Sequence, residues 1–136
     1  LLLGLMSDKT VISLEHVPEW AVRVNSALDA AGCSNRVSLV KMVSYEDFDW
    51  YEMPPIPPKS VAFVVCDGPP SATRGGRFGL FPLAREHFAP GARILMDDAE
   101  RSTEKEIISR WNQQFGLQVE FSANSEGEWA LLTVTS

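Results

Sequence analysis

Residues 60–70, SVAFVVCDGPP, give the clearest indication of the fold. An almost continuous apolar run ends at Cys66, and Asp67 with the Gly-Pro-Pro that follows it stops the run. Strands of this composition are usually buried on both faces, as they are in a parallel sheet. We therefore predict that residues 60–66 form an inner parallel strand with Asp67 at its carboxyl end.

The segments around this strand alternate between strand-like and helix-like patterns. The other strand-like segments are residues 10–15, 36–43, 92–96, 117–121 and 128–134. The helix-like segments are residues 19–31, 78–88 and about 102–115. This alternation predicts an α/β fold with a mostly parallel sheet and helices on both of its faces. A short, turn-like segment joins the last two strands, so we expect a C-terminal antiparallel hairpin.

Composition and charge argue against several classes of function. The 136 residues predict a single domain over residues 1–136. Twelve lysines and arginines against 18 aspartates and glutamates give a net charge of −6, which disfavours nucleic-acid binding through a broad basic face. No apolar run of about 18 residues is present, so we expect no membrane span. The two cysteines form no CxxC pair, which favours a cytoplasmic protein with reduced thiols.

Acidic residues follow three of the predicted strands: Glu15, Asp67 and the pair Asp97-Asp98. Ligands of open α/β sheets bind outside the carboxyl ends of the strands, so these side chains are the candidate functional residues. Each also has a structural alternative. Glu15 would be a solvated strand end, Asp67 would form an Asx turn, and one residue of the pair would cap the next helix.

The adjacent carboxylates of Asp97 and Asp98 repel each other unless a positive charge offsets them. A divalent cation or an arginine such as Arg101 would supply that charge. Ligands that are oxygen atoms alone favour Mg²⁺ or Ca²⁺ over zinc. The pair therefore predicts either a site for a hard cation or an ion pair.

The segment GGRFG, residues 75–79, resembles a phosphate loop only superficially, because it does not match the spacing of the known loops. Its glycines, with Arg74 and Arg77, favour a mobile active-site flap. The two arginines are candidates for holding an acidic group of the substrate, with ion-paired surface residues as the alternative.

The run from Val11 to Val134 resembles the larger, later part of a class I S-adenosylmethionine-dependent methyltransferase domain. The resemblance is carried by the segments VISLEH, RVSLV, VAFVVCDGPP and GRFGLFPLAREHFAPGARILMDDAER, and by the terminal hairpin. The sequence is most similar to small bacterial methyltransferases in which a DGPP turn precedes a DDAxR segment. This resemblance implies a Rossmann-like, seven-stranded sheet whose last strand is antiparallel.

The resemblance also implies contacts with the cofactor, S-adenosylmethionine. Glu15 matches the acid that binds the ribose of the cofactor, and His16 would flank the adenosine. Ser44 and Tyr45 would lie near the adenine. Asp67 matches the acidic position near the methionine part of the cofactor and near the substrate.

Metal-dependent O-methyltransferases place carboxylates after these same strands. Asp67, Asp97 and Asp98 fall on the positions that bind Mg²⁺ and the substrate hydroxyl in those enzymes, with Asp67 and Asp97 as the catalytic residues. The activity implied is methyl transfer to a small molecule, at oxygen, with or without assistance from Mg²⁺.

The family's first strand and its Gly-rich loop are missing from this sequence, so we expect a domain that is incomplete at its N-terminus. Either residues 1–6 or a second copy, in a homodimer, would then cover the exposed sheet edge. Two alternatives stay open. One is a non-catalytic binding or interaction module, and the other is a nicotinamide-dependent Rossmann enzyme, in which Glu15 would also match the ribose contact.

Overall fold

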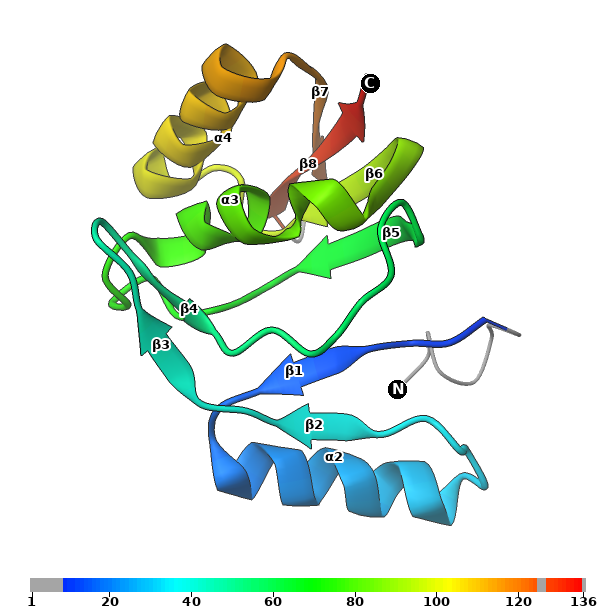
Figure 1. Cartoon of the computed structure of the whole chain (residues 1–136). Coiled ribbons are helices and arrows are strands. Elements are labelled where there is room, and N and C mark those ends of the chain that lie inside the picture. Colours follow the sequence, from blue (N-terminus) through cyan, green and yellow to red (C-terminus); the bar gives the residue numbers. More distant parts are fainter. Residues whose placement is uncertain (1–8, 125–126, 136) are drawn as a thin grey trace. The chain divides into compact units, whose positions relative to one another are not determined.

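The computed structural model describes residues 9–124 and 127–135 (Figure 1). The chain divides into two compact units. The first unit consists of Leu1–Val43 and Tyr51–Met53, and the second unit of Ser44–Trp50 and Pro54–Ser136. The single domain expected from the length stays a prediction, and each unit is described by itself.

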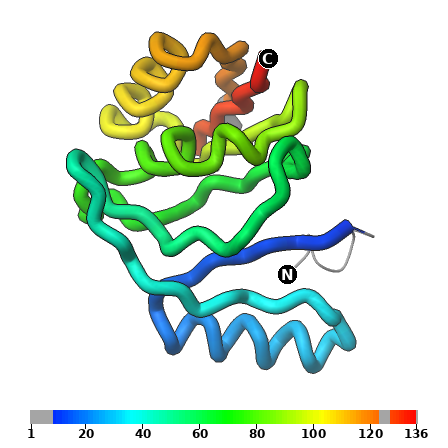
Figure 2. The backbone as a smooth tube through the Cα atoms, in the orientation of Figure 1, coloured from blue at the N-terminus to red at the C-terminus, as the bar shows by residue number. Residues whose placement is uncertain are grey.

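The first unit is a strand–helix–strand element (Figure 2). The strands β1 (Ser13–Glu15) and β2 (Val37–Leu39) pair in parallel, and helix α2 (Pro18–Ala30) connects them. Proline suits the first helical position because it lacks the N–H that would be unsatisfied there. The side chain of Asn25 ties the helix to β2, since its amide donates to the oxygen of Val37 at 3.0 Å and accepts from the Val37 nitrogen at 2.8 Å.

The predicted strand over residues 36–43 is interrupted. β2 ends at Leu39, and a second strand, β3 (Met42–Ser44), pairs with β4 (Asp49–Tyr51). Sequence patterns did not predict β4, which is only three residues long. In the turn between the two strands the backbone N–H of Tyr45 donates to the oxygen of Phe48 at 2.8 Å.

The second unit contains a four-stranded sheet. Its strands are β5 (Val61–Cys66), β6 (Phe88–Met96), β7 (Leu117–Asn124) and β8 (Gly127–Val134), in the order β5-β6-β8-β7. β5 and β6 are parallel, and β8 is antiparallel to both β6 and β7, which confirms the predicted hairpin. The resemblance implied a single seven-stranded sheet, whereas the described strands pair in three separate sheets.

Helices cover one face of this sheet. They are η1 (Gly76–Gly79), α3 (Leu80–Ala84), η2 (Arg85–His87) and α4 (Ser102–Phe115). Trp111 of α4 and Phe81 of α3 are fully buried, with ring centroids 5.1 Å apart. The indole Nε1 of Trp111 donates to the oxygen of Phe78 at 3.0 Å, so α4 also fixes the backbone of η1.

Two expectations about this region are wrong. The sequence patterns end a helix at residue 88 and begin a strand only at residue 92, whereas Pro90 and Gly91 lie inside β6, because an irregular register between β5 and β6 accommodates them. Residues 75–79 are not a flap. A Cβ on Gly79 would lie 2.8 Å from a ring carbon of Phe48 and 2.9 Å from one of Trp50, so this turn is packed tightly. Among the described residues, the helices are too short or too polar to cross a bilayer.

Candidate functional site

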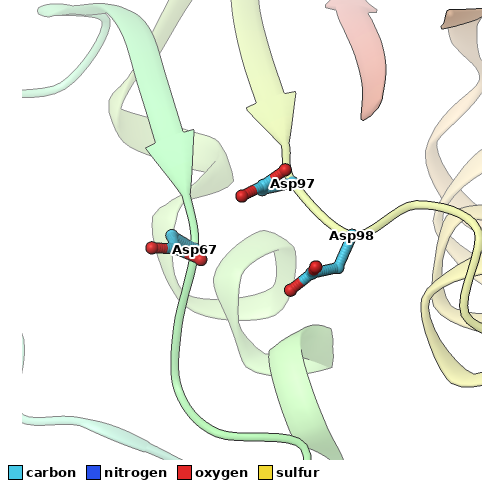
Figure 3. A group of neighbouring side chains, drawn as sticks. All are labelled: Asp67, Asp97 and Asp98. Atoms are coloured by element: carbon cyan, nitrogen blue, oxygen red, sulfur yellow. The ribbon is translucent and has the colours of Figure 1, made fainter. Parts of the chain in front are cut away.

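Three carboxylates meet at one edge of the four-stranded sheet. Asp67 directly follows β5, and Asp97 and Asp98 directly follow β6 (Figure 3). Because the two strands are parallel neighbours, their carboxyl ends reach the same edge. One carboxylate oxygen from each residue lies within 4.8 Å of the others. The sequence-predicted residues Asp67, Asp97 and Asp98 are therefore brought together, and we call them the aspartate cluster.

The backbone at this edge is held in an unusual conformation. Asp98 has a φ of +54°, in the left-handed region that aspartate tolerates better than most residues. The backbone N–H of Arg101 donates to the Asp98 oxygen at 3.1 Å, and that of Ala99 donates to the Glu128 oxygen at 2.9 Å. This turn redirects the chain from β6 into α4 and leaves the Asp97 side chain exposed.

Arginines supply the positive charge at the aspartate cluster. Nη2 of Arg77 lies 3.3 Å from Oδ2 of Asp98 and 3.8 Å from Oδ1 of Asp67. Nη1 of Arg101 lies 3.0 Å from the same Asp98 oxygen. Asp98 is thus shared between two arginines. In the described part of the chain the carboxylate of Asp97 has no hydrogen-bond or ion-pair partner, and the side chain of Asp67 is 74% exposed, so both carboxylates are more available to a ligand than that of Asp98.

Arg77 is buried, with only 3% of its side chain exposed. Its guanidinium also donates to backbone oxygens, from Nη2 to Asp67 at 3.0 Å and from Nη1 to Asp97 at 2.5 Å. Behind it lies the buried carboxylate of Glu104, whose Oε1 is 3.9 Å from Nε of Arg77. Sequence analysis missed Glu104, although its spacing to Ile107, Ile108 and Trp111 places it on the buried stripe of α4.

Arg74 has different partners. Its guanidinium donates to the oxygens of Glu46 and Tyr45 and lies 2.9 Å from Oδ1 of Asp49. Hydrogen bonds from Ser44 and Arg74 to the carboxylate of Asp49 lower its pKa. Both Arg74 and Arg77 are thus bonded within the protein, and their predicted contact with a substrate stays a prediction.

The predicted adenine contacts lie in and next to the β3–β4 hairpin. Ser44 ends β3, and its hydroxyl is bonded to Asp49. The ring of Tyr45 stacks on that of Phe48, with centroids 5.1 Å apart. Their contact with adenine remains untested.

Glu15 lies at the end of β1 in the first unit, and its carboxylate turns back on its own chain. Oε1 accepts the backbone N–H groups of His16 at 2.7 Å and Val17 at 2.9 Å. Next to it is an open groove of about 420 Å³. The groove is lined by His16, Pro18, Leu39, Val40, Lys41 and Met42.

Cys66, at the end of β5, is a buried thiol that does not ionise at neutral pH. Burial raises the pKa of the Cys66 thiol to about 12, so it stays protonated at neutral pH. Its Sγ lies 3.6 Å from the oxygen of Gly68, as a weak donor would. Cys66 is a small buried apolar residue, as its place in an apolar strand predicts.

No protein-family model matches the sequence, and neither does any curated protein. Among solved structures, the chain is similar to a methyltransferase from Pyrococcus furiosus, with a TM-score of 0.62 and 16% identity over 97% of this chain and 68% of that one. A methyltransferase from Geobacter sulfurreducens gives a TM-score of 0.59 and 14% identity over 94% of this chain, which spans 60% of that structure. This chain therefore has the α/β, Rossmann-like fold of methyltransferase structures, as the sequence predicted.

Proposed function

We propose that this protein transfers a methyl group from S-adenosylmethionine to a hydroxyl group of a small molecule. The observation that carries the proposal is the aspartate cluster, whose carboxylate oxygens gather within 4.8 Å at the ends of two adjacent parallel strands. Ligands of open α/β sheets bind at this edge. The fold shared with methyltransferase structures supports the choice of reaction.

The first unit offers contacts that suit the adenosine part of the cofactor. The groove beside His16 has apolar walls from Leu39 and Met42, which fit the face of a purine. Glu15 precedes this groove, and a carboxylate at such a strand end accepts hydrogen bonds from ribose hydroxyls. We assign Glu15 and His16 to the cofactor, together with Ser44, Tyr45 and Asp67. When bound, S-adenosylmethionine supplies a methyl group on a positively charged sulfur.

The aspartate cluster would act on the methyl acceptor. We propose that Asp67 and Asp97 orient the oxygen of the acceptor hydroxyl and that one of the two carboxylates takes up its single proton as the general base, while S-adenosylhomocysteine is the leaving group. Asp67 suits this role because its side chain is 74% exposed. Asp98, which is held by Arg77 and Arg101, would keep the cluster in place.

The donor set also fits Mg²⁺, which binds carboxylate oxygens. We propose that Asp67, Asp97 and Asp98 hold the ion. When bound, it would lower the pKa of the acceptor hydroxyl. The two arginines on Asp98 compete for one of the three ligands, so we expect weak metal binding.

Calorimetric titration of S-adenosylhomocysteine into the chain, with and without MgCl₂, tests the proposal. We expect binding in the micromolar range that Glu15→Ala abolishes. Glu19→Ala is the matched control, because Glu19 is an exposed acid on the first turn of α2. Absence of binding to a chain that circular dichroism shows to be folded would contradict the proposal.

A non-catalytic interaction module is the second candidate, and one observation favours it. The apolar side chains of Phe63 and Val65 on β5 are 47% and 44% exposed. Among the described strands, β5 pairs only with β6. A homodimer that covers this edge would bury both side chains. Concentration-dependent sedimentation that Phe63→Lys abolishes, in a chain that does not bind S-adenosylhomocysteine, would support this candidate.

A further inference from the structure

We infer that Arg77 is a positioning residue, whose buried guanidinium ties the carboxyl ends of β5 and β6 together and so sets the spacing of the aspartate cluster. The effect of this spacing on catalysis rests on the proposed function. The tie itself rests on contacts within the second unit alone.

The guanidinium connects two strands through their backbone. One terminal nitrogen donates to the oxygen of Asp67 after β5, and the other donates to the oxygen of Asp97 after β6. A guanidinium is planar, so its two terminal nitrogens present their N–H groups in a fixed fork. The distance between the two strand ends is therefore set by a rigid group. A lysine has a single nitrogen and would not reproduce this geometry.

Arg77 also offsets the charge of the carboxylates around it. Its terminal nitrogen Nη2 lies 3.3 Å from Asp98 and 3.8 Å from Asp67, and Nε lies 3.9 Å from the buried Glu104. Carboxylates this close repel one another, and burial strengthens the interaction. The guanidinium therefore holds the cluster together before any ligand or cation arrives.

The surrounding structure keeps Arg77 from moving. The next residue, Phe78, is held through its backbone oxygen by the indole of Trp111. Gly79 packs against Phe48 and Trp50 so closely that a methyl group would not fit. Helix α4 carries both Trp111 and Glu104, so one helix fixes the backbone next to Arg77 and supplies a carboxylate beside its guanidinium.

Hydrogen exchange of the backbone amides tests the tie without any ligand. The amide of Asp97 donates to the oxygen of Cys66 at 3.4 Å and so reports on the junction of β5 and β6. In Arg77→Lys we expect this amide to exchange roughly tenfold faster, as loss of a charge-assisted hydrogen bond implies. The amides of the β7–β8 ladder should keep their wild-type rates.

Arg110→Lys is the matched control, because Arg110 is exposed and stacks on the ring of Phe78 at 4.0 Å. It should leave the exchange of Asp97 unchanged. An unchanged Asp97 rate in Arg77→Lys would overturn the inference. A uniform acceleration of all amides would do the same, since it would indicate general stability instead of local positioning.

A measurement on the wild-type chain decides the matter if Arg77→Lys does not fold. Hydrogen-bonded, buried guanidinium nitrogens should give separate, slowly exchanging Nη resonances for Arg77 in NMR spectra. Averaged resonances, as solvated arginines give, would overturn the inference.

The affinity for S-adenosylhomocysteine then tests the link to function. If the wild type binds it, Arg77→Lys should weaken binding about tenfold while Arg110→Lys does not. Equal affinities would overturn the catalytic part of the inference. If the wild type does not bind S-adenosylhomocysteine, the proposed function fails. The exchange experiment then still decides whether Arg77 ties the ends of β5 and β6 together.

Discussion

Acids stand at three strand ends in this molecule, and the chain uses the acid of β1 differently from the acids after β5 and β6. At the end of β1 the carboxylate of Glu15 accepts the N–H groups of the next two residues. At the ends of β5 and β6 the carboxylates approach one another, and arginines offset their charge.

The difference follows from what comes after each strand. Helix α2 begins at Pro18, and the residue before it, Val17, provides no side-chain cap. The backbone N–H groups of His16 and Val17, which immediately precede the helix, need an acceptor, and Glu15 supplies it. After β6 the backbone oxygen of Asp98 accepts the N–H of Arg101, so the side chain of Asp98 is not needed as an acceptor for that group. An acid at a strand end offers both carboxylate oxygens to a ligand only when nearby N–H groups need neither of them, and at Glu15 one oxygen, Oε1, is already bonded to the chain.

The largest effect should come from Trp111, which fixes the helix behind the aspartate cluster. Trp111→Ala should lower the free energy of unfolding by about 3–5 kcal/mol, because it empties a fully buried site. Trp20 of the first unit is 53% exposed, and Trp20→Ala should cost less than about 1 kcal/mol. Urea denaturation followed by circular dichroism measures both. Equal losses would show that the two units do not differ in packing.

Gly79→Ala should have the next largest effect. The added methyl group would meet Phe48 and Trp50 at less than 3 Å, so we expect a loss of about 1–3 kcal/mol in unfolding free energy. Gly32→Ala in the first unit meets no atom within 4 Å, but its φ of +67° costs about 1 kcal/mol. Urea denaturation measures the free energy of unfolding of both variants. An unchanged free energy for Gly79→Ala would contradict the tight packing of this turn.

Alanine variants of Glu15 and Asp67 compare the acid that is bonded to its own chain with an acid of the aspartate cluster. Glu15→Ala should cost about 1 kcal/mol, because two backbone N–H groups lose their acceptor. Glu15→Gln keeps an oxygen there and should cost less. Asp67→Ala should change the unfolding free energy by no more than about 0.5 kcal/mol, since its side chain is 74% exposed. A larger loss for Asp67→Ala than for Glu15→Ala would reverse the assignment of the two acids.

The smallest effect concerns Asp49. Hydrogen bonds from Ser44 and Arg74 hold the pKa of this carboxyl below its ordinary value of 3.8. A lowered pKa in the folded state stabilises the protein above that ordinary value, and the contribution is lost as the pH falls through the lowered pKa. Asp49→Asn should therefore be slightly less stable than the wild type at pH 7, with a difference that shrinks on acidification below about pH 4. Thermal melts at several pH values measure it, and a difference independent of pH would contradict it.

Much of the second unit is predictable because its patterns are long. The apolar run ending at Cys66 is β5, the helix expected up to Phe115 is α4, and the last two strands form the expected hairpin. These segments carry enough periodic residues to outweigh local exceptions. The positions of Asp67, Asp97 and Asp98 at one edge followed from the parallel pairing alone.

Other features depend on partners that are distant in the sequence. The polar residues Arg77 and Glu104 are buried because they lie near each other, and no local pattern reveals the pairing. Pro90 and Gly91 are typical of loops, yet the irregular register against β5 keeps them in a strand. β4 is too short to show an alternation.

The place of β8 between β6 and β7 has a consequence for synthesis on the ribosome. Of the four strands of this sheet β8 is made last, but it is an interior strand. Until it emerges, β7 has no neighbour among these strands and β6 has only β5, and the buried residues Ile94 and Met96 lack their cross-strand partners Leu132 and Ala130. The sheet of the second unit is therefore completed only once β8 has left the ribosome, and a nonsense mutation before Gly127 would remove an interior strand of the sheet together with everything after it.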